Sequence, residues 1–271
     1  MNVRRHPDYD DVTEVVVEIK FEGAFEPAYT DGDNSQILPT DTMRNTVYAL
    51  AKDHLVASIE SFGLMLSRHF LKNNPQVNHV EVALVESLWA HIEVSEADSE
   101  ELKPHPYTFL SAGNEKRTCL VQQTRGSVVL ESGIKDLHIL KTTRSGFEGF
   151  LRDEFTTLKE TSDRLFGTNL LASWRYREPT DVDVTRCRRI LRQTLLESFA
   201  RHDSLSVQHT LYAMGDAALE QCEEIASIRL SMPNVHRLLV DLSPFDMENS
   251  NEIFVPVDEP YGLIEATLDR A

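Results

Sequence analysis

VTEVVVEIKF, residues 12–21, places apolar and charged side chains at alternating positions. The apolar set runs from Val15 to Phe21 at every second residue, and Glu18 and Lys20 lie on the opposite face. A period of two is typical of a half-buried β-strand, because successive side chains of a strand point to opposite faces. We therefore predict that the first half of the chain is organised around a sheet.

Two helices are predicted to follow this strand. Apolar residues recur at steps of three and four over about residues 41–53 and again over residues 59–70, and the second run stops before Pro75. Such spacing draws one apolar face on a helix. Alternation returns at residues 80–84, so the first half is predicted as strand, helix, helix, strand.

The second half repeats this order. Strands are predicted near residues 137–142 and 170–177, then helices over 187–199 and 207–222, then strands over 225–231 and 235–242. The first of these helices is the clearest, because one continuous stripe runs from Cys187 to Phe199. The repeated order predicts an α+β protein of two related modules, each a sheet with its helices on one face.

The chain has 271 residues and a formal net charge of −17. This charge disfavours nucleic acid and anionic membrane surfaces as partners, since both attract cationic proteins. A site for an anionic substrate would need its own local cation. The acid-rich segment 96–103 is predicted to be a solvated loop.

The cysteines and histidines predict neither disulfides nor a metal site. Cys119, Cys187 and Cys222 are odd in number and far apart, which favours a reduced cytoplasmic protein. The ten histidines lack the paired helical spacing of metal ligands. The first residues, MNVRRHPDYDD, do not resemble a signal peptide, and phosphate-binding glycine motifs are absent. These patterns alone lead to a soluble protein with two α+β modules.

Four segments together resemble the urate oxidase (uricase) family. They are NSQILPTDTMRNTVYALAKDH (34–54), GFEGFLRDEFTTLKETSDR (146–164), SVQHTLYAM (206–214) and LSMPNVHRLLVDL (230–242). The resemblance spans nearly the whole chain. It implies two tandem modules of the tunnelling fold (T-fold), with antiparallel sheets and helices on one face, over residues 1–133 and 134–271. The N-terminal strand of the first module would be incomplete.

The resemblance also implies an activity and an assembly. Members of the family oxidise urate with dioxygen and water to 5-hydroxyisourate and hydrogen peroxide, as a step of purine degradation and without a cofactor. Four chains close around a central tunnel, and the active sites lie between subunits. The same activity, assembly and cytoplasmic location are therefore expected here.

The family's functional positions fall on eight residues of this sequence. Those that bind urate correspond to Phe147, Arg164, Val207, Gln208 and Asn234. Those that face dioxygen and relay protons correspond to Thr40, Asp41 and His236, of which Thr40 and His236 are the predicted catalytic residues.

The chemistry of these residue types suits urate, a planar anion with amide-like edges. A guanidinium such as that of Arg164 grips an edge with two parallel bonds and supplies the local cation. The Gln208 carboxamide offers a donor and an acceptor to the opposite edge, and the Phe147 ring can stack on the purine face.

Each residue also has a simpler interpretation. Arg164 could be a surface arginine and Phe147 a core residue. Gln208, and likewise Thr40 with Asp41, could merely belong to the capping region of a helix. His236 follows a predicted turn at residues 233–235 and could be a core histidine on an apolar strand face. Only the joint match with the family favours the site.

One family feature has no counterpart in the sequence given. The family pattern begins with a Tyr-Gly-Lys segment whose lysine takes part in proton transfer, and this sequence starts at Met1 beyond that point. Lys20 does not match that position. The alternatives are a start assigned too late, a weakened homologue that only binds purines, or a pterin-handling enzyme of the same fold. Peroxide production with urate distinguishes an active enzyme from the purine-binding homologue, and a metal assay distinguishes the pterin-handling enzyme.

Overall fold

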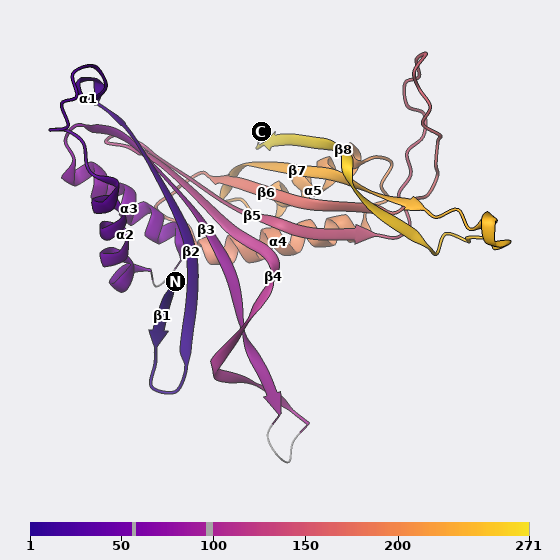
Figure 1. Cartoon of the computed structure of the whole chain (residues 1–271), viewed down its shortest axis with the longest axis horizontal. Helices are drawn as coiled ribbons and strands as arrows, with labels where there is room; N and C mark the ends of the chain where they lie inside the picture. Colours follow the sequence, from indigo (N-terminus) through magenta and orange to yellow (C-terminus); the bar gives the residue numbers. More distant parts are fainter. Residues whose placement is uncertain (56–57, 96–99, 271) are drawn as a thin grey trace. The chain divides into compact units, whose positions relative to one another are not determined.

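The computed structural model describes residues 1–55, 58–95 and 100–270. Its helices and strands are shown in Figure 1. In chain order they are β1 (Asn2–Arg5), β2 (Asp10–Gly23), α1 (Glu26–Thr30), α2 (Thr40–His54), α3 (Ile59–Asn73), β3 (Val77–Ser95), β4 (Leu102–Thr124), β5 (Val128–Lys141), β6 (Phe166–Tyr176), α4 (Val184–Arg201), α5 (Val207–Gln221), β7 (Ile225–Leu239), the 3-10 turn η1 (Ser243–Phe245) and β8 (Phe254–Asp269). No helix in the described ranges has the length and apolar character required to cross a membrane.

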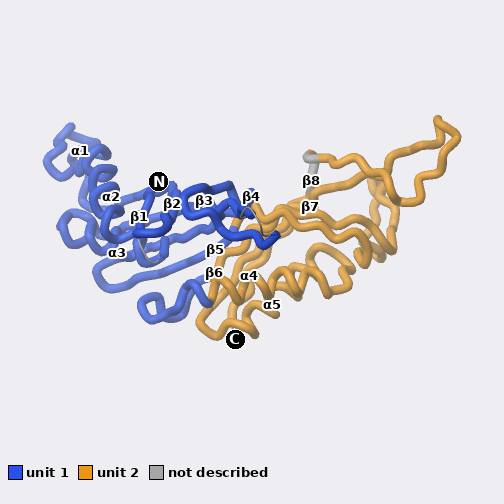
Figure 2. The backbone as a smooth tube through the Cα atoms, turned by 90° about the horizontal axis from the view of Figure 1, so that it is seen from below, with its two compact units in different colours: residues 1–134, 175–186 blue, residues 135–174, 187–271 orange. Residues whose placement is uncertain are grey.

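The chain divides into two compact units, coloured separately in Figure 2. Unit 1 contains residues 1–134 and 175–186, and unit 2 contains residues 135–174 and 187–271. The two-module division at residues 133 and 134 stays a prediction. It differs from the compact units in the segment 175–186, which packs with the first unit.

Unit 1 is built on antiparallel strands. β2 pairs with β1 and β3, and β3 pairs with β4, with Val17 opposite Leu84 and Leu84 opposite Cys119. The apolar stripe of α3 packs on β3 and β4, where Phe62 and Leu66 are buried completely. Burial of side chains of this size contributes about 1.5–3 kcal/mol each. No residue of α2 is buried, so α3 rather than α2 belongs to the core.

Gly63 allows α3 to approach the strands closely. A Cβ atom at this position would lie 2.9 Å from Cδ1 of Leu84 and 3.0 Å from Cγ2 of Val121. We therefore expect Gly63→Val to lower the free energy of unfolding by about 1–3 kcal/mol, the usual cost of overpacking a core. Denaturant unfolding measures this change. Gly126→Val is the matched control, because nothing lies within 4 Å of a Cβ atom there. Equal stability of the two variants would contradict the packing argument.

Unit 2 pairs β7 with β8 in antiparallel register, and α5 packs on both strands. In Figure 1, α4 and α5 lie on the same face of the strands of this unit. The predicted stripe of α4 is buried, from Cys187 through Leu191 and Leu195 to Phe199. The predicted α+β class, with antiparallel strands and helices on one face, is confirmed.

The element predictions are confirmed for β2, β3, β5, β6 and helices α2 to α5, with shifts at their ends. The predicted separation of two strands by a turn at residues 233–235 is wrong, because β7 continues through Pro233 without a turn. Proline cannot donate to a strand ladder, and the register shift between Asn234 and His236 absorbs the irregularity without ending the strand. The loop predicted over residues 96–103 is wrong at 102–103, which belong to β4, and residues 96–99 lie outside the described ranges.

Candidate active site

The side chains of Phe147 and Arg164 lie next to one another in unit 2. The Phe147 N–H donates to the Thr161 carbonyl at 2.7 Å, and the Thr161 N–H donates to the Phe147 carbonyl at 3.2 Å. Near this paired backbone, the guanidinium carbon of Arg164 lies 5.7 Å from the centre of the Phe147 ring. A cation at this distance is attracted by the electron-rich face of the ring. Two of the residues predicted to bind urate are therefore neighbours.

Arg164 is a half-buried cation with an unsatisfied donor. Its Nε atom is inaccessible to solvent and has no hydrogen-bond partner within the part of the chain that the structure describes. Burial lowers the pKa of Arg164 from its ordinary value, but a guanidinium stays charged at neutral pH. Buried polar groups are nearly always paired in folded proteins. An orphaned donor on a cation is the feature expected of a site that receives an anion.

Asp163 holds the Arg164 segment against the Phe147 segment. Its carboxylate accepts a hydrogen bond from the Thr143 hydroxyl at 2.6 Å and one from the Ser145 N–H at 3.2 Å. The bond from Thr143 is the main reason that the pKa of Asp163 lies below its usual value. The carboxylate therefore orders both sides of the Phe147–Arg164 pair.

We expect Asp163→Ala to weaken urate binding by roughly fivefold, the effect of losing one net hydrogen bond. Thr143→Val should produce a smaller loss in the same direction, because it removes one bond and keeps the charge. The pKa of Asp163 is lowered in the folded protein, so its carboxylate orders the site fully at any pH above the usual Asp pKa. This ordering is lost as the pH falls through the lowered pKa, below about pH 4. Calorimetric titration with urate at neutral pH tests the variants, and unchanged affinity in both would contradict the positioning role.

A second backbone bridge joins the Phe147 segment to the start of α5. The Gly146 N–H donates to the Ser204 carbonyl at 2.8 Å, and the Ser204 N–H donates to the Arg144 carbonyl at 3.0 Å. Two residues later Ser206 caps α5, since its hydroxyl accepts from the His209 N–H at 3.0 Å. The cap fixes the first helical residues, which are the predicted site residues Val207 and Gln208. Val207 is buried and Gln208 is exposed.

The Lys141 side chain, at the end of β5, contacts the segment between α4 and α5. The Lys141 amine donates to the His202 carbonyl, and Nε2 of His202 lies 3.2 Å from Nδ1 of His209. Burial, then His209 and Lys141, lower the pKa of His202, so this imidazole resists protonation. Lys141 and Arg164 therefore supply local positive charge in a strongly acidic chain.

Asn234 and His236 lie on β7 and are half-buried. The register shift falls between them, with Asn234 opposite Gly262 and His236 opposite Val257. The pairing is regular from His236 to Leu239, so His236 and Leu238 share a face, whereas Val240 and Leu242, which were expected on the same face, lie beyond the end of β7. A bulge of this kind is a common way of re-aiming a side chain near a site.

The segment after Arg164 also approaches β7. A Cβ atom on Gly167 would lie 3.4 Å from the Val235 carbonyl oxygen, so the two backbones are close at this point. Val235 stands between Asn234 and His236 in the sequence. The backbone that carries Arg164 is therefore a neighbour of the strand that carries Asn234 and His236.

Thr40 and Asp41 begin α2 in unit 1, and both are exposed. The simpler interpretation as capping residues is wrong for their side chains: Pro39 occupies the N-cap position, and no side chain caps the helix. The Asp41 carboxylate instead accepts from Arg44 and from the Asn45 amide one turn later. The Thr40 hydroxyl and the first amides of α2 are thus available for another partner.

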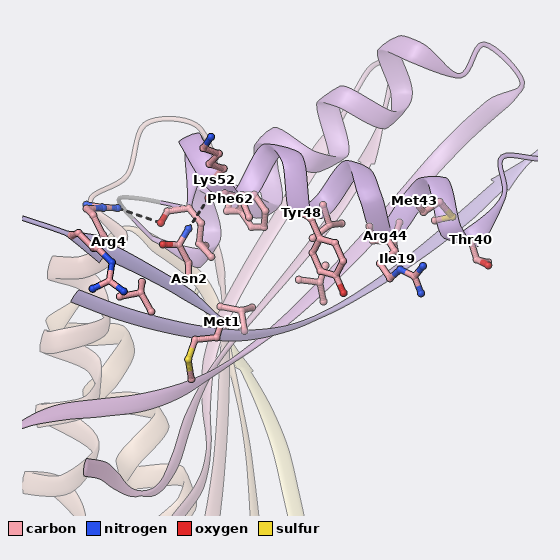
Figure 3. A pocket seen from close by; sticks show the side chains of 17 residues that line it. Met1, Asn2, Arg4, Ile19, Thr40, Met43, Arg44, Tyr48, Lys52 and Phe62 are labelled. Carbon is pink, nitrogen blue, oxygen red and sulfur yellow. Dashed lines mark hydrogen bonds between the residues drawn. The ribbon is translucent and has the colours of Figure 1, made fainter. Parts of the chain in front are cut away.

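Thr40 also lines a cavity of about 1010 Å³ between α2 and the start of the chain. Figure 3 shows Met43, Arg44 and Tyr48 of α2 along one side of it and Ile19 of β2 below. Asn2 and Arg4 close one end, where their side chains donate to the carbonyls of Ala51 and Leu55.

The structure connects some of the predicted site residues and leaves others apart. Backbone bridges, the cation and ring contact, and the Ser206 cap link Phe147, Arg164, Val207 and Gln208, and the close approach of Gly167 adds the β7 pair. Thr40 and Asp41 belong to unit 1. The sequence did not indicate Asp163 and Ser204 as site residues, since their hydrogen-bond partners are distant along the chain. Of the positioning residues, only Ser206 has a local sequence pattern: a serine three residues before the N–H group that it caps.

Comparison with known proteins is consistent across sequence and structure. The sequence model of a protein family described as Uricase matches residues 3–122 and 130–265. A uricase of Oryctolagus cuniculus is 38% identical over 276 residues, covering 100% of this chain and 90% of that protein. A uricase of Arthrobacter globiformis is 38% identical over 270 residues, covering 100% of this chain and 85% of that protein.

The crystal structure of uricase from Arthrobacter globiformis superposes with a TM-score of 0.91 at 39% identity, covering 99% of this chain and 89% of that one. The chain thus matches uricases in sequence and in backbone structure from the first strand to the last. The matched ranges include all the segments that carry Phe147, Arg164, Gln208 and His236. On these grounds the chain belongs to the uricase family.

Proposed function

We propose that the chain oxidises urate with dioxygen and water to 5-hydroxyisourate and hydrogen peroxide, with neither metal nor flavin. Urate gives up two electrons to dioxygen, which becomes peroxide, and the oxygen of water adds to the purine ring. The observation that carries this proposal within the family is the half-buried Arg164 guanidinium beside the Phe147 ring, with a donor that has no partner in the described chain.

In the proposed site the purine lies between a cation and an aromatic face. Arg164 donates two parallel bonds to one edge of urate, and Gln208 completes the opposite edge with one donor and one acceptor. Phe147 stacks on the ring, and Val207 and Asn234 bound the remaining sides. Base stacking on an aromatic side chain contributes about 1–3 kcal/mol, so the flat anion is held firmly in one plane.

Thr40, Asp41 and His236 manage dioxygen and protons in this proposal. The Thr40 hydroxyl and the Asp41 N–H at the start of α2 face the position of dioxygen or water, where a helix N-terminus stabilises developing negative charge. His236 moves protons, for which an imidazole with its near-neutral intrinsic pKa is suited. Catalysis is then positional and electrostatic, since the substrate itself is easily oxidised.

The enzyme test follows two products at once. The purified chain is mixed with urate in air, and loss of urate absorbance in the ultraviolet is compared with formation of hydrogen peroxide. One peroxide for each urate supports the proposed reaction. Urate binding without peroxide would reject catalysis by this chain and leave a purine-binding protein, and turnover that is abolished by metal chelation would reject the cofactor-free reaction.

The proposed assembly is a homotetramer with each site shared between subunits. It is supported by the division of the predicted site residues between the two compact units and by exposed apolar side chains on long strands, among them Leu110 of β4 and Leu238 of β7. The proposed location is the cytoplasm, supported by Cys119, Cys187 and Cys222, which are thiols.

Complementation tests the shared site directly. Thr40→Val and His236→Asn are each expected to have little activity, and co-expression should restore about a quarter of the sites if Thr40 and His236 come from different subunits. Size-exclusion chromatography with light scattering measures the assembly in parallel. A mixed preparation that stays inactive although mixed tetramers form would contradict the shared site.

A further inference from the structure

Two cysteines that are distant in the sequence meet in unit 2. Cys187 lies in the first turn of α4, and Cys222 is the C-cap residue of α5. Both are completely buried. The half-buried Glu224 joins them, and the ligand atoms of the three side chains all lie within 4.8 Å of one another. We propose that Cys187, Cys222 and Glu224 bind one zinc ion, which links the start of α4 to the end of α5.

The geometry of the three side chains suits a tetrahedral ion. Two thiolates bound at about 2.3 Å to tetrahedral zinc lie about 3.8 Å apart, and a thiolate and a carboxylate oxygen lie slightly closer. Sγ of Cys222 is 3.4 Å from Oε2 of Glu224. No separation within the group exceeds 4.8 Å, so the excess over the ideal value is at most about 1 Å, which small side-chain rotations close.

The backbone around Cys222 is held in place before any ion binds. Arg270 donates to the carbonyls of Leu219, Cys222 and Ile225, and the Cys222 N–H donates to the Ala218 carbonyl. A ligand on an ordered backbone loses little conformational freedom on binding. The negative end of the α5 dipole also favours a cation at Cys222, and the positive end of α4 favours a thiolate at Cys187.

The donor set selects the class of ion. Thiolates prefer zinc and other thiophilic ions over magnesium and calcium, which bind oxygen ligands. Three protein ligands leave a fourth position for water. Glu224 is the least buried member, so an ion can reach the buried sulfurs from its side. The proposed ion is structural and has no part in urate oxidation.

Cys119 provides the matched control within the same chain. It is also buried, but it lies on β4 in unit 1 and belongs to no metal-ligating group among the described residues. Cys119→Ser therefore removes one buried thiol and leaves the proposed site intact.

The experiment uses the full chain, reduced and treated with a chelator, with three thiols counted after denaturation. Titration with zinc by calorimetry, and with cadmium by its thiolate charge-transfer absorption, should give one ion per chain and raise the Tm. Cys187→Ser and Cys222→Ser should lose the cadmium absorption, whereas Cys119→Ser should keep it. Glu224→Gln should weaken zinc binding while the absorption remains.

Three results would overturn the proposal. The first is absence of the cadmium absorption in the reduced parent chain, and the second is its persistence when both Cys187 and Cys222 are replaced by serine. The third is a count of one thiol under denaturing, non-reducing conditions after aerobic purification, which would indicate a disulfide in place of the ion. If the serine variants fail to fold, the absorption of Cys119→Ser and the affinity of Glu224→Gln still decide between the outcomes.

Discussion

Arg164→Lys should weaken urate binding by about 10- to 100-fold and leave the fold unchanged. A lysine keeps the positive charge but offers a single point donor, whereas the guanidinium offers two parallel donors to one edge of the purine. Loss of one hydrogen bond to a charged group costs about 1.5–3 kcal/mol, which corresponds to this change in affinity. Isothermal titration with urate under anaerobic conditions measures binding without turnover.

The chain contains a matched control for this substitution. Arg152 also lies over an aromatic ring, with its guanidinium carbon 5.0 Å from the centre of Phe150, but it is exposed. Arg152→Lys should therefore leave urate affinity unchanged. Equal urate affinity of Arg164→Lys and the parent chain would reject the proposed two-bond contact of Arg164 with urate. Equal losses of urate affinity in Arg164→Lys and Arg152→Lys would indicate a nonspecific effect of replacing an arginine by a lysine.

Helices α3, α4 and α5 could be predicted from the sequence because one face of each is buried. The stripe from Cys187 to Phe199 is visible in the sequence as steps of three and four, and the same face packs into the core of unit 2. Strands β1, β4 and β8 were missed, β1 because it has only four residues. β4 has few buried residues along its length, and β8 contains prolines at 256 and 260 and Gly262, so neither shows the alternation of a half-buried strand.

The site could be predicted only through the family resemblance. Asp163 contacts Thr143 and Ser145, and Ser204 contacts Gly146, so the contacts that order the site join positions 18 to 58 residues apart. No local pattern encodes such contacts. The meeting of Cys187 and Cys222 was missed for the same reason: the two cysteines are 35 residues apart in the sequence and were interpreted as separate reduced thiols, and only the fold brings their side chains together.

His236→Asn should lower kcat by about 10²- to 10⁴-fold while urate affinity changes little. Asparagine retains a polar side chain of similar size but cannot exchange a proton near neutral pH, and this range is the usual contribution of a general acid or base. Stopped-flow loss of urate absorbance gives kcat, and anaerobic titration gives the affinity. His69→Asn, at another half-buried histidine on α3, should have the parent's kcat.

A double substitution distinguishes proton transfer from a general loss of site geometry. If Thr40 and His236 act on the same proton, Thr40→Val combined with His236→Asn should lower kcat no further than the more damaging single substitution, because one removed step cannot be removed twice. Independent contributions would instead multiply. Multiplied losses, or a His236→Asn variant that loses affinity as much as kcat, would reject a shared relay and leave His236 as a binding residue.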